Sequence, residues 1–151
     1  MKQVKPLLLS LFWIYLTPSI LGNDHLGKLV DNHPAFIEGQ LIYLLNNKPT
    51  PQCHASTIVE TNAGMVASWF GGTHEKNTDV GIWVSRRINN KWRKPFKVAD
   101  GSEGEDKEYP CWNPVLFKTQ SGKLLLFYKV GSSPSKWWGM IRESNDNGES
   151  W

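Results

Sequence analysis

Beyond the first 22 residues, apolar and β-branched residues gather in short runs separated by polar turns, and these runs recur along the chain. Sliding the sequence by 58 residues, the separation of Cys53 and Cys111, superimposes one set of runs on the other. Each set predicts a β-hairpin, a run, a polar turn ending in glycine and a second run. The runs and turns are residues 56–59, Gly64 and residues 65–70 in the first copy, and residues 115–117, Gly122 and residues 124–130 in the second.

A third run follows each hairpin, at residues 80–85 and 138–144, and the first copy adds a fourth run at residues 92–98. Four antiparallel strands that recur about every 50 to 60 residues are typical of β-propeller blades. The pattern therefore predicts an all-β fold, a β-propeller of which about two four-stranded blades are present. A β-sandwich whose two halves are similar by coincidence is the alternative. After the leader, the sequence shows no helical period.

The first residues have the pattern of a secretory signal peptide, which we place at residues 1–22. Lys2 and Lys5 precede an apolar run at residues 6–16, and Gly22 follows as a small residue. A membrane anchor is the alternative, but the run is shorter than the roughly 20 apolar residues that a span needs. We therefore expect a secreted or periplasmic protein with no stable membrane span after cleavage.

Charge and composition indicate which kinds of molecule the protein is expected to bind. The sequence has 17 basic and 14 acidic residues, and without Lys2 and Lys5 the balance is 15 to 14, or +1. Nucleic-acid-binding proteins carry a strongly basic surface, so we expect no nucleic-acid partner. Eight Trp, 13 Gly and 9 Pro residues instead fit a turn-rich, aromatic-rich β-protein of the kind that binds carbohydrate.

The last eight residues form a motif of the type Ser-x-Asp-x-Gly-x-Ser-Trp, made by Ser144, Asp146, Gly148 and Trp151. A short acidic side chain can bind turn amides, glycine supplies a positive φ, and a Trp can pack beneath the hairpin. The motif resembles the Asp-box, or BNR, repeat of the sialidase superfamily, which folds as a six-bladed β-propeller. Residues 85–92 look like a degenerate copy that keeps the Ser and the Trp.

The resemblance extends over residues 35–151. Asn113-Pro114-Val115 is similar to the second-blade strand of sialidases, whereas Cys53-His54-Ala55-Ser56-Thr57 stands where an Arg-Ile-Pro strand is expected. Here the chain resembles a divergent sialidase-like subgroup. Residues 23–52 are then an N-terminal segment with a strand that closes the propeller, and residues 53–151 are the first two blades. Six blades of 58 residues need about 350 residues, so we expect an N-terminal fragment.

Four residues are candidates for catalysis. Histidine transfers protons near neutral pH, so His54, at the start of an inner strand, is a candidate acid or base; a histidine that only hydrogen-bonds at a strand end is the alternative. The loop after Gly71-Gly72 carries His74, Glu75 and Asp79. The resemblance implies an acid/base carboxyl in this loop, and a solvated turn is the alternative. Between the carboxyls we favour Glu75, because Asp79 abuts a strand and could cap it.

Tyr109 and Trp112 are candidates for substrate binding, because aromatic rings stack on the apolar faces of sugars. Asn113, next to Trp112 in the same strand, is a third candidate. For each Trp, a packed blade residue is the alternative. Cys53 and Cys111 occupy equivalent positions in neighbouring inner strands, so a disulfide between them is a hypothesis if the geometry allows it. No cofactor and no metal site are expected.

The resemblance implies a secreted sialidase-like glycoside hydrolase that acts at the non-reducing end of a glycan, with sialic acid or another acidic sugar as the substrate. Sialidases use a Tyr nucleophile, and the resemblance places that residue in later blades that this chain does not contain. Two alternatives stay open. One is a glycan-binding propeller without catalysis, and the other is a polysaccharide lyase on the same fold, in which His54 and Tyr109 would serve as base and acid.

Overall fold

The structure is a computed structural model that describes residues 39–102 and 108–151. The chain divides into two compact units, Met1–Leu41 and Ile42–Trp151, and the strands lie in the second unit. The expected signal peptide, residues 1–22, lies outside the described residues. Within the described ranges, no helix is long and apolar enough to cross a membrane.

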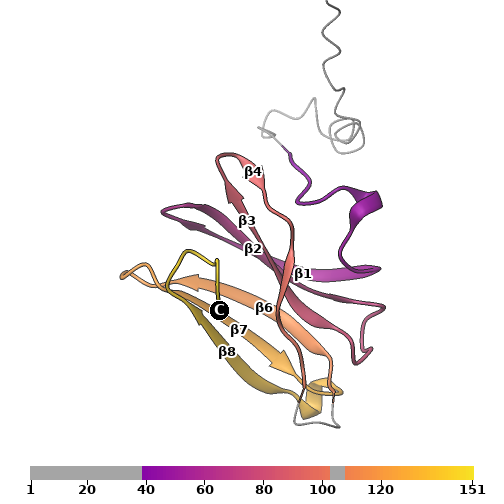
Figure 1. The fold of residues 1–151 in the computed structure, drawn as a ribbon. Helices are drawn as coiled ribbons and strands as arrows, with labels where there is room; N and C mark the ends of the chain where they lie inside the picture. The colour runs from indigo at the N-terminus through magenta and orange to yellow at the C-terminus, as the bar shows by residue number, and fades with distance from the viewer. Residues whose placement is uncertain (1–38, 103–107) are drawn as a thin grey trace, which may run out of the picture. The chain divides into compact units, whose positions relative to one another are not determined.

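The first repeat copy folds into one antiparallel sheet, the first blade (Figure 1). β1 forms one edge, β2 and β3 follow in order, and two short strands pair with the far side of β3. The hairpin and the third strand expected from the sequence are therefore confirmed. The strands of this blade are β1 (Gln52–Thr61), β2 (Gly64–Gly72), β3 (Gly81–Ile88), β4 (Lys91–Trp92) and β5 (Phe96–Ala99).

The fourth strand of the first blade, expected at residues 92–98, is broken into β4 and β5. Pro95 lies between the two pieces and has no N–H group to donate to the β3 ladder. The buried Ser85 hydroxyl of β3 donates instead to the carbonyl oxygen of Arg93 over 2.7 Å, and the Arg93 N–H donates to the carbonyl oxygen of Arg86 over 2.8 Å. These bonds bridge the break, so the edge of the sheet remains attached.

The second repeat copy forms the second blade, an antiparallel sheet in the order β6-β7-β8. Its strands are β6 (Cys111–Lys118), β7 (Leu124–Val130) and β8 (Trp138–Ser144), and a short 3-10 turn, η2 (Pro134–Lys136), precedes β8. β7 and β8 begin and end where the apolar runs do. The alternation of apolar and polar positions therefore predicted both the strands and their pairing.

The expected closing strand within residues 23–52 is not found in the described part of that segment. Residues 39–51 contain one 3-10 turn, η1 (Leu45–Asn47), and no strand precedes β1 there. Tyr43 of this segment packs on Trp69 of β2, with ring centroids 5.8 Å apart. Tyr43 therefore packs on the first blade through its side chain, without adding a strand to the sheet.

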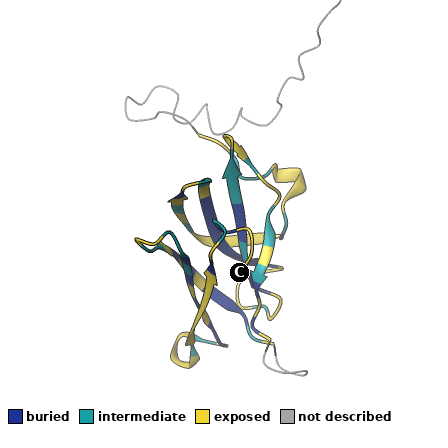
Figure 2. Cartoon of the chain, turned by 60° about the vertical axis from the view of Figure 1, so that its left-hand side comes forward, coloured by how far each residue is buried: buried dark blue, intermediate teal, exposed yellow. Residues whose placement is uncertain are grey.

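The hydrophobic core lies between the two sheets. β6 contacts both β1 and β2, and the Thr57 hydroxyl of β1 accepts a hydrogen bond from the Leu116 N–H of β6 over 3.3 Å. Figure 2 shows buried positions along the strands of both blades. Burying each large aliphatic side chain contributes about 1.5–3 kcal/mol, so this interface is the main source of stability. The core includes Val66, Phe70, Ile82 and Val84 from the first blade and Leu116, Leu124, Leu126 and Tyr128 from the second.

The two edge strands that meet at this interface, β1 and β6, share an irregularity. The register shifts between His54 and Thr57 in β1, and between Trp112 and Val115 in β6. In each case two residues face one residue of the partner strand, which is a β-bulge. The repeat is therefore preserved in the backbone conformation as well as in the sequence.

Residues 85–92 are a tight β-hairpin. Asn89 and Asn90 both have positive φ, 53° and 61°, and they separate the paired residues Ile88 and Lys91. Two positive-φ residues between paired strands make a type I′ turn, which Asn tolerates well. The segment that resembled a degenerate Asp box thus makes its turn by a different mechanism.

Candidate functional site

The strand register separates the Asp box from the start of β6. In the second blade, Ser144 pairs with Leu124 at one end of the sheet, whereas Trp138 and Cys111 both pair with Val130 at the other. The Asp box follows Ser144 directly. It therefore lies at the end of the blade opposite to that at which β6 begins.

The first blade has the same polarity. Cys53 pairs with Gly71 at the end where β1 begins, and Thr61 pairs with Gly64 at the other end. The Cys111 N–H donates to the carbonyl oxygen of Val80 over 2.9 Å, so the starts of β1 and β6 lie at one common end. We call this the site end. It holds every catalytic and substrate-binding candidate proposed from the sequence.

A chain of ring contacts connects the two blades at the site end. The His54 ring lies 5.6 Å from that of Phe70 with an interplanar angle of 25°, and Phe70 lies 5.9 Å from Trp112. Trp112 in turn lies 5.0 Å from Trp137, and Lys129 Nζ lies 5.0 Å from the centroid of the Trp137 ring. His54 and Trp112 thus share Phe70 as a neighbour, as their equivalent positions in the repeat suggest. Phe70 itself was not predicted, because nothing separates it in sequence from an ordinary core residue.

The individual aromatic candidates differ in exposure. Trp112 is 4% exposed, and its Nε1–H donates to the carbonyl oxygen of Gly131 over 2.8 Å, so in this structure it is a packed blade residue. Tyr109 is half-buried and meets Trp138 edge-on at 5.3 Å. Asn113 is exposed within the β6 bulge. Of these three side chains, that of Asn113 is the most open to solvent.

The loop between β2 and β3 is held closed by Asp79. Its carboxylate accepts hydrogen bonds from the Thr73 N–H over 3.0 and 3.2 Å and from the Thr73 hydroxyl over 2.7 Å. The Thr73 hydroxyl is the main cause of a pKa of Asp79 below its ordinary value. A general acid needs a raised pKa. The hydrogen bonds and the lowered pKa therefore favour a structural role for Asp79, which is to close the loop. Glu75 remains the better candidate of the two carboxyls.

Glu75 and His74 lie between the two residues that close this loop. The Glu75 N–H donates to Gln52 Oε1 at the start of β1 over 3.4 Å, and His74 Nδ1 lies 2.9 Å from the carbonyl oxygen of Glu75. Both side chains are exposed. The contact with Gln52 ties the loop to the same strand that carries His54. Gln52 was not recognised as a candidate from the sequence, because a polar residue before a strand is common.

The disulfide hypothesis is not supported, since Cys53 and Cys111 are both free in the structure. Cys111 is fully buried in the core between the blades, and burial raises the pKa of its thiol to about 12. Cys53 is exposed, and its Sγ lies 3.2 Å from the hydroxyl oxygen of Tyr43. Although the two cysteines occupy equivalent positions in the repeat, the Cys53 thiol is exposed and the Cys111 thiol is buried.

Two hollows lie near these residues. One of about 330 Å³ adjoins His54 and is lined also by Tyr43, Cys53 and Trp69. The other, of about 560 Å³, lies over the exposed face of the second sheet, where Phe127 contributes to a largely apolar lining. Of the catalytic candidates only His54 lines the first hollow, so we place the candidate site at the site end as a whole, where His54 and the loop that bears Glu75 lie near the start of β1. Among the residues that the structure describes, no group of three or more His, Cys, Asp or Glu side chains could hold a metal ion.

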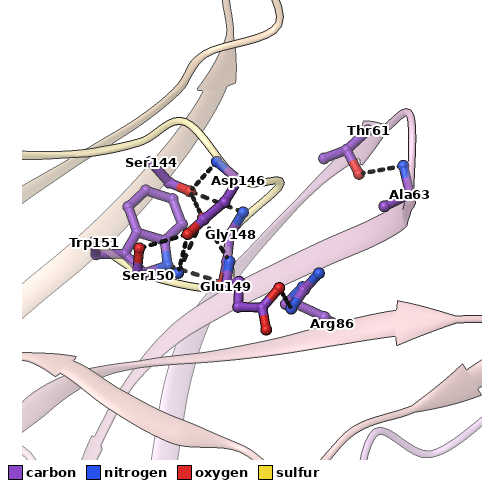
Figure 3. A network of polar contacts seen from close by, with 9 residues as sticks. All are labelled: Thr61, Ala63, Arg86, Ser144, Asp146, Gly148, Glu149, Ser150 and Trp151. Atoms are coloured by element: carbon purple, nitrogen blue, oxygen red, sulfur yellow. Dashed lines mark hydrogen bonds and ion pairs between the residues drawn. The ribbon is translucent and has the colours of Figure 1, made fainter.

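The Asp box closes a compact turn at the opposite end (Figure 3). The buried Ser144 hydroxyl donates to Asp146 over 2.7 Å and accepts from the Gly148 N–H over 2.9 Å. Asp146 also accepts from the N–H and the hydroxyl of Ser150, and the Ser150 hydroxyl is the main cause of a pKa of Asp146 well below its ordinary value. The Trp151 Nε1–H donates to the carbonyl oxygen of Gly148 over 3.2 Å. These bonds all serve to hold the turn.

Comparison with known proteins gives a family. The model of the BNR repeat-like domain matches residues 63–151. The chain belongs to this family. The BNR repeat-like chain is also similar to the solved structure of a Hadza microbial sialidase, Hz136, with 12% identity and a TM-score of 0.61, covering 73% of this chain and 27% of that one.

A second solved structure is that of a protein of unknown function from Dyadobacter fermentans. It is 16% identical with a TM-score of 0.54, and the match covers 77% of this chain and 38% of that one. The curated proteins include no match. At these identities the likeness shows the fold, and the all-β, sialidase-type β-propeller expected from the sequence is confirmed. The BNR repeat-like chain spans about a quarter of the length of the sialidase.

Proposed function

We propose that the protein is a secreted, sialidase-like glycoside hydrolase that acts at the non-reducing end of a glycan. The observation that carries the proposal is the arrangement of the site end, where His54 and the loop that bears Glu75 are both attached to the start of β1. The likeness to a solved microbial sialidase supports the same chemistry. Secretion rests on the leader pattern of residues 1–22.

In this proposal Glu75 is the acid/base. The clasp between Asp79 and Thr73 fixes the ends of the loop, and Gly72 allows the close approach, since a β-carbon there would lie 2.9 Å from Asp79 Oδ1. The exposed carboxyl of Glu75 is free to reach a bound glycan, where it would donate a proton to the glycosidic oxygen. His54, also exposed, would contact the same sugar.

Because this chain spans 27% of the sialidase that it matches, the proposal concerns a whole propeller, to which these two blades contribute one part of the site. The nucleophile and the groups that hold an acidic sugar then belong to other blades. Sialic acid or another acidic sugar is the proposed substrate class.

The test is incubation of the whole protein with sialosides and with glycans that contain uronic acids. Release of a monosaccharide supports the proposal, whereas an unsaturated product indicates a lyase. Loss of a general acid lowers the rate by about 10²- to 10⁴-fold, so Glu75→Gln should reduce kcat by at least that lower factor. Glu149→Gln removes an exposed carboxylate at the opposite end and serves as the matched control. An unchanged rate in Glu75→Gln would reject the assigned role.

A glycan-binding propeller without catalysis is the second candidate, and one observation favours it. Asp79 lies in the loop where sialidases carry their acid/base. Its carboxylate accepts three hydrogen bonds from Thr73, and its pKa is lowered. Binding of a glycan without any product would support this candidate. A lyase has less support. It would need His54 and Tyr109 to act together as base and acid, but His54 packs on Phe70 whereas Tyr109 packs on Trp138.

A further inference from the structure

The bulges in β1 and β6 contain unusual backbone conformations. Ala55 has a φ of 52° and Asn113 a φ of 38°, and each comes directly after a candidate site residue, His54 or Trp112. The other non-glycine residues with positive φ among those described lie in turns: Lys76, Asn89, Asn90 and Asn147. The two strand positions are therefore exceptions that need a reason.

Both conformations are unfavourable for the residues present. An alanine β-carbon crowds the backbone at positive φ, and at other positive-φ positions this chain uses glycine, as at Gly122 with a φ of 89°. Asn113 precedes Pro114, and a following proline favours an extended conformation with negative φ. Strain of this kind persists where the surrounding structure holds it, and it gathers at functional sites.

The bulge decides which face of the first blade carries His54. Residues directly opposite in an antiparallel pair point to the same side. Thr57 pairs with Ser68 and His54 pairs with Phe70, so His54 and Thr57 share a face although they are three residues apart. In a regular strand they would point to opposite faces, because side chains alternate. The extra residue therefore turns His54 toward Phe70.

The same change of alternation occurs in the second blade. Val115 pairs with Phe127 and Trp112 pairs with Lys129, so Trp112 shares a face with Val115. On that side Lys129 lies over the Trp137 ring, which also contacts Trp112. The two bulges thus have the same effect in both copies.

We propose that Ala55 and Asn113 are positioning residues, which hold His54 and Trp112 on their faces of the sheets at the site end through the two strained bulges. The proposal deepens the proposed function and rests on it for the role of the site. The statement that residue 55 controls the stacking of His54 on Phe70 depends only on the strand register and not on the proposed function.

The test is an NMR measurement of the His54 imidazole protons in the whole protein, with His54→Asn for assignment. A ring stacked on Phe70 shifts these protons upfield and gives an NOE to the Phe70 ring. Ala55→Val disfavours positive φ, because a β-branched side chain crowds the backbone further. We expect this variant to lose the upfield shift and to lower kcat/KM on the glycan by about 100-fold. Ala55→Gly accepts positive φ and should keep the upfield shift.

Asn89→Val is the matched control, because Asn89 has a φ of 53° in the hairpin turn at the opposite end. It should lower stability but leave both the His54 signals and kcat/KM unchanged. Retention of the stacked signals in Ala55→Val would overturn the proposal, and so would their loss with an unchanged kcat/KM. If Ala55→Val does not fold, the wild-type NOE decides, since its absence places His54 on the other face. If no glycan is turned over, the proposed function fails while the His54 signals still test the bulge.

Discussion

The Asp-box glycine is predicted to hold the two blades together through steric fit. Gly148 has a φ of +83°, and a β-carbon there would lie 3.1 and 3.2 Å from the two methyl carbons of Val66 in the first blade. Val66 is 1% exposed and has little room to move. In Gly148→Ala, positive φ costs about 1–2 kcal/mol and overpacking costs about 1–3 kcal/mol. We expect a total loss of about 2–5 kcal/mol in the free energy of unfolding.

Gly122→Ala separates the two contributions. Gly122 has a φ of +89°, but a β-carbon there would meet nothing within 4 Å. This variant should therefore lose only the backbone part, about 1–2 kcal/mol. The difference between the two variants measures the contact of the Asp-box turn with the first blade.

Urea unfolding of the whole protein is the assay, and a double-mutant cycle sharpens it. Val66→Ala removes the methyl groups that the new β-carbon would meet, so combining it with Gly148→Ala should cost about 1–2 kcal/mol less than the sum of the single variants. The reasoning is refuted if Gly148→Ala costs no more than Gly122→Ala. It is equally refuted if the two substitutions are additive.

Three further predictions follow from the described contacts. The pKa of Asp146 is lowered in the folded state, so its carboxylate contributes stability that is present above its unfolded pKa near 3.9 and is lost at lower pH. Asp146→Asn should therefore lose less stability than the wild type when the pH falls below about 4. Urea unfolding curves that show the same loss in both proteins would contradict this. In the native protein a thiol reagent should modify the exposed Cys53 quickly and the buried Cys111 only after unfolding, and two fast reactions, or none, would contradict the structure. Trp112→Ala should cost about 3–5 kcal/mol in the free energy of unfolding, because the ring is buried and bonded to Gly131; a loss under about 1 kcal/mol would show that the ring is not packed.

The sequence predicted the hairpins because their signal is local. Alternating apolar residues that end at Gly64 or Gly122 specify both the strands and the turn. The break between β4 and β5 also had a visible cause, since Pro95 cannot donate to a ladder. The I′ turn has a local signal in Asn89-Asn90, whereas the flanking Ser85 and Trp92 carry the resemblance to an Asp box.

The bulges and the state of the cysteines were harder to foresee. A bulge is defined by the pairing of two strands, so the sequence of β1 alone cannot show that His54 shares a face with Thr57. Pro114 was one signal, because proline within a strand favours a bulge. The repeat also suggested that Cys53 and Cys111 are alike, yet burial depends on which neighbouring sheet covers each strand.

Preference for Glu75 over Asp79 came from position, since Asp79 adjoins β3. The structure adds the reason, which is that Thr73 uses the Asp79 carboxylate to close the loop. Tyr43 was missed entirely. Its segment has no repeat or motif, and its contacts with Trp69 and Cys53 appear only in three dimensions.

The Asp box and the site end divide structural and chemical tasks between the two ends of each blade. At the box end, Gly148 packs against Val66 and the exposed Glu149 lies 3.2 Å from Arg86, so the Asp-box turn of the second blade contacts the first blade. At the site end, the bulges set which side chains share a face of each sheet, and Asp79 closes the loop that bears Glu75. A match to the repeat therefore identifies the propeller, whereas the substrate must be read from the site end.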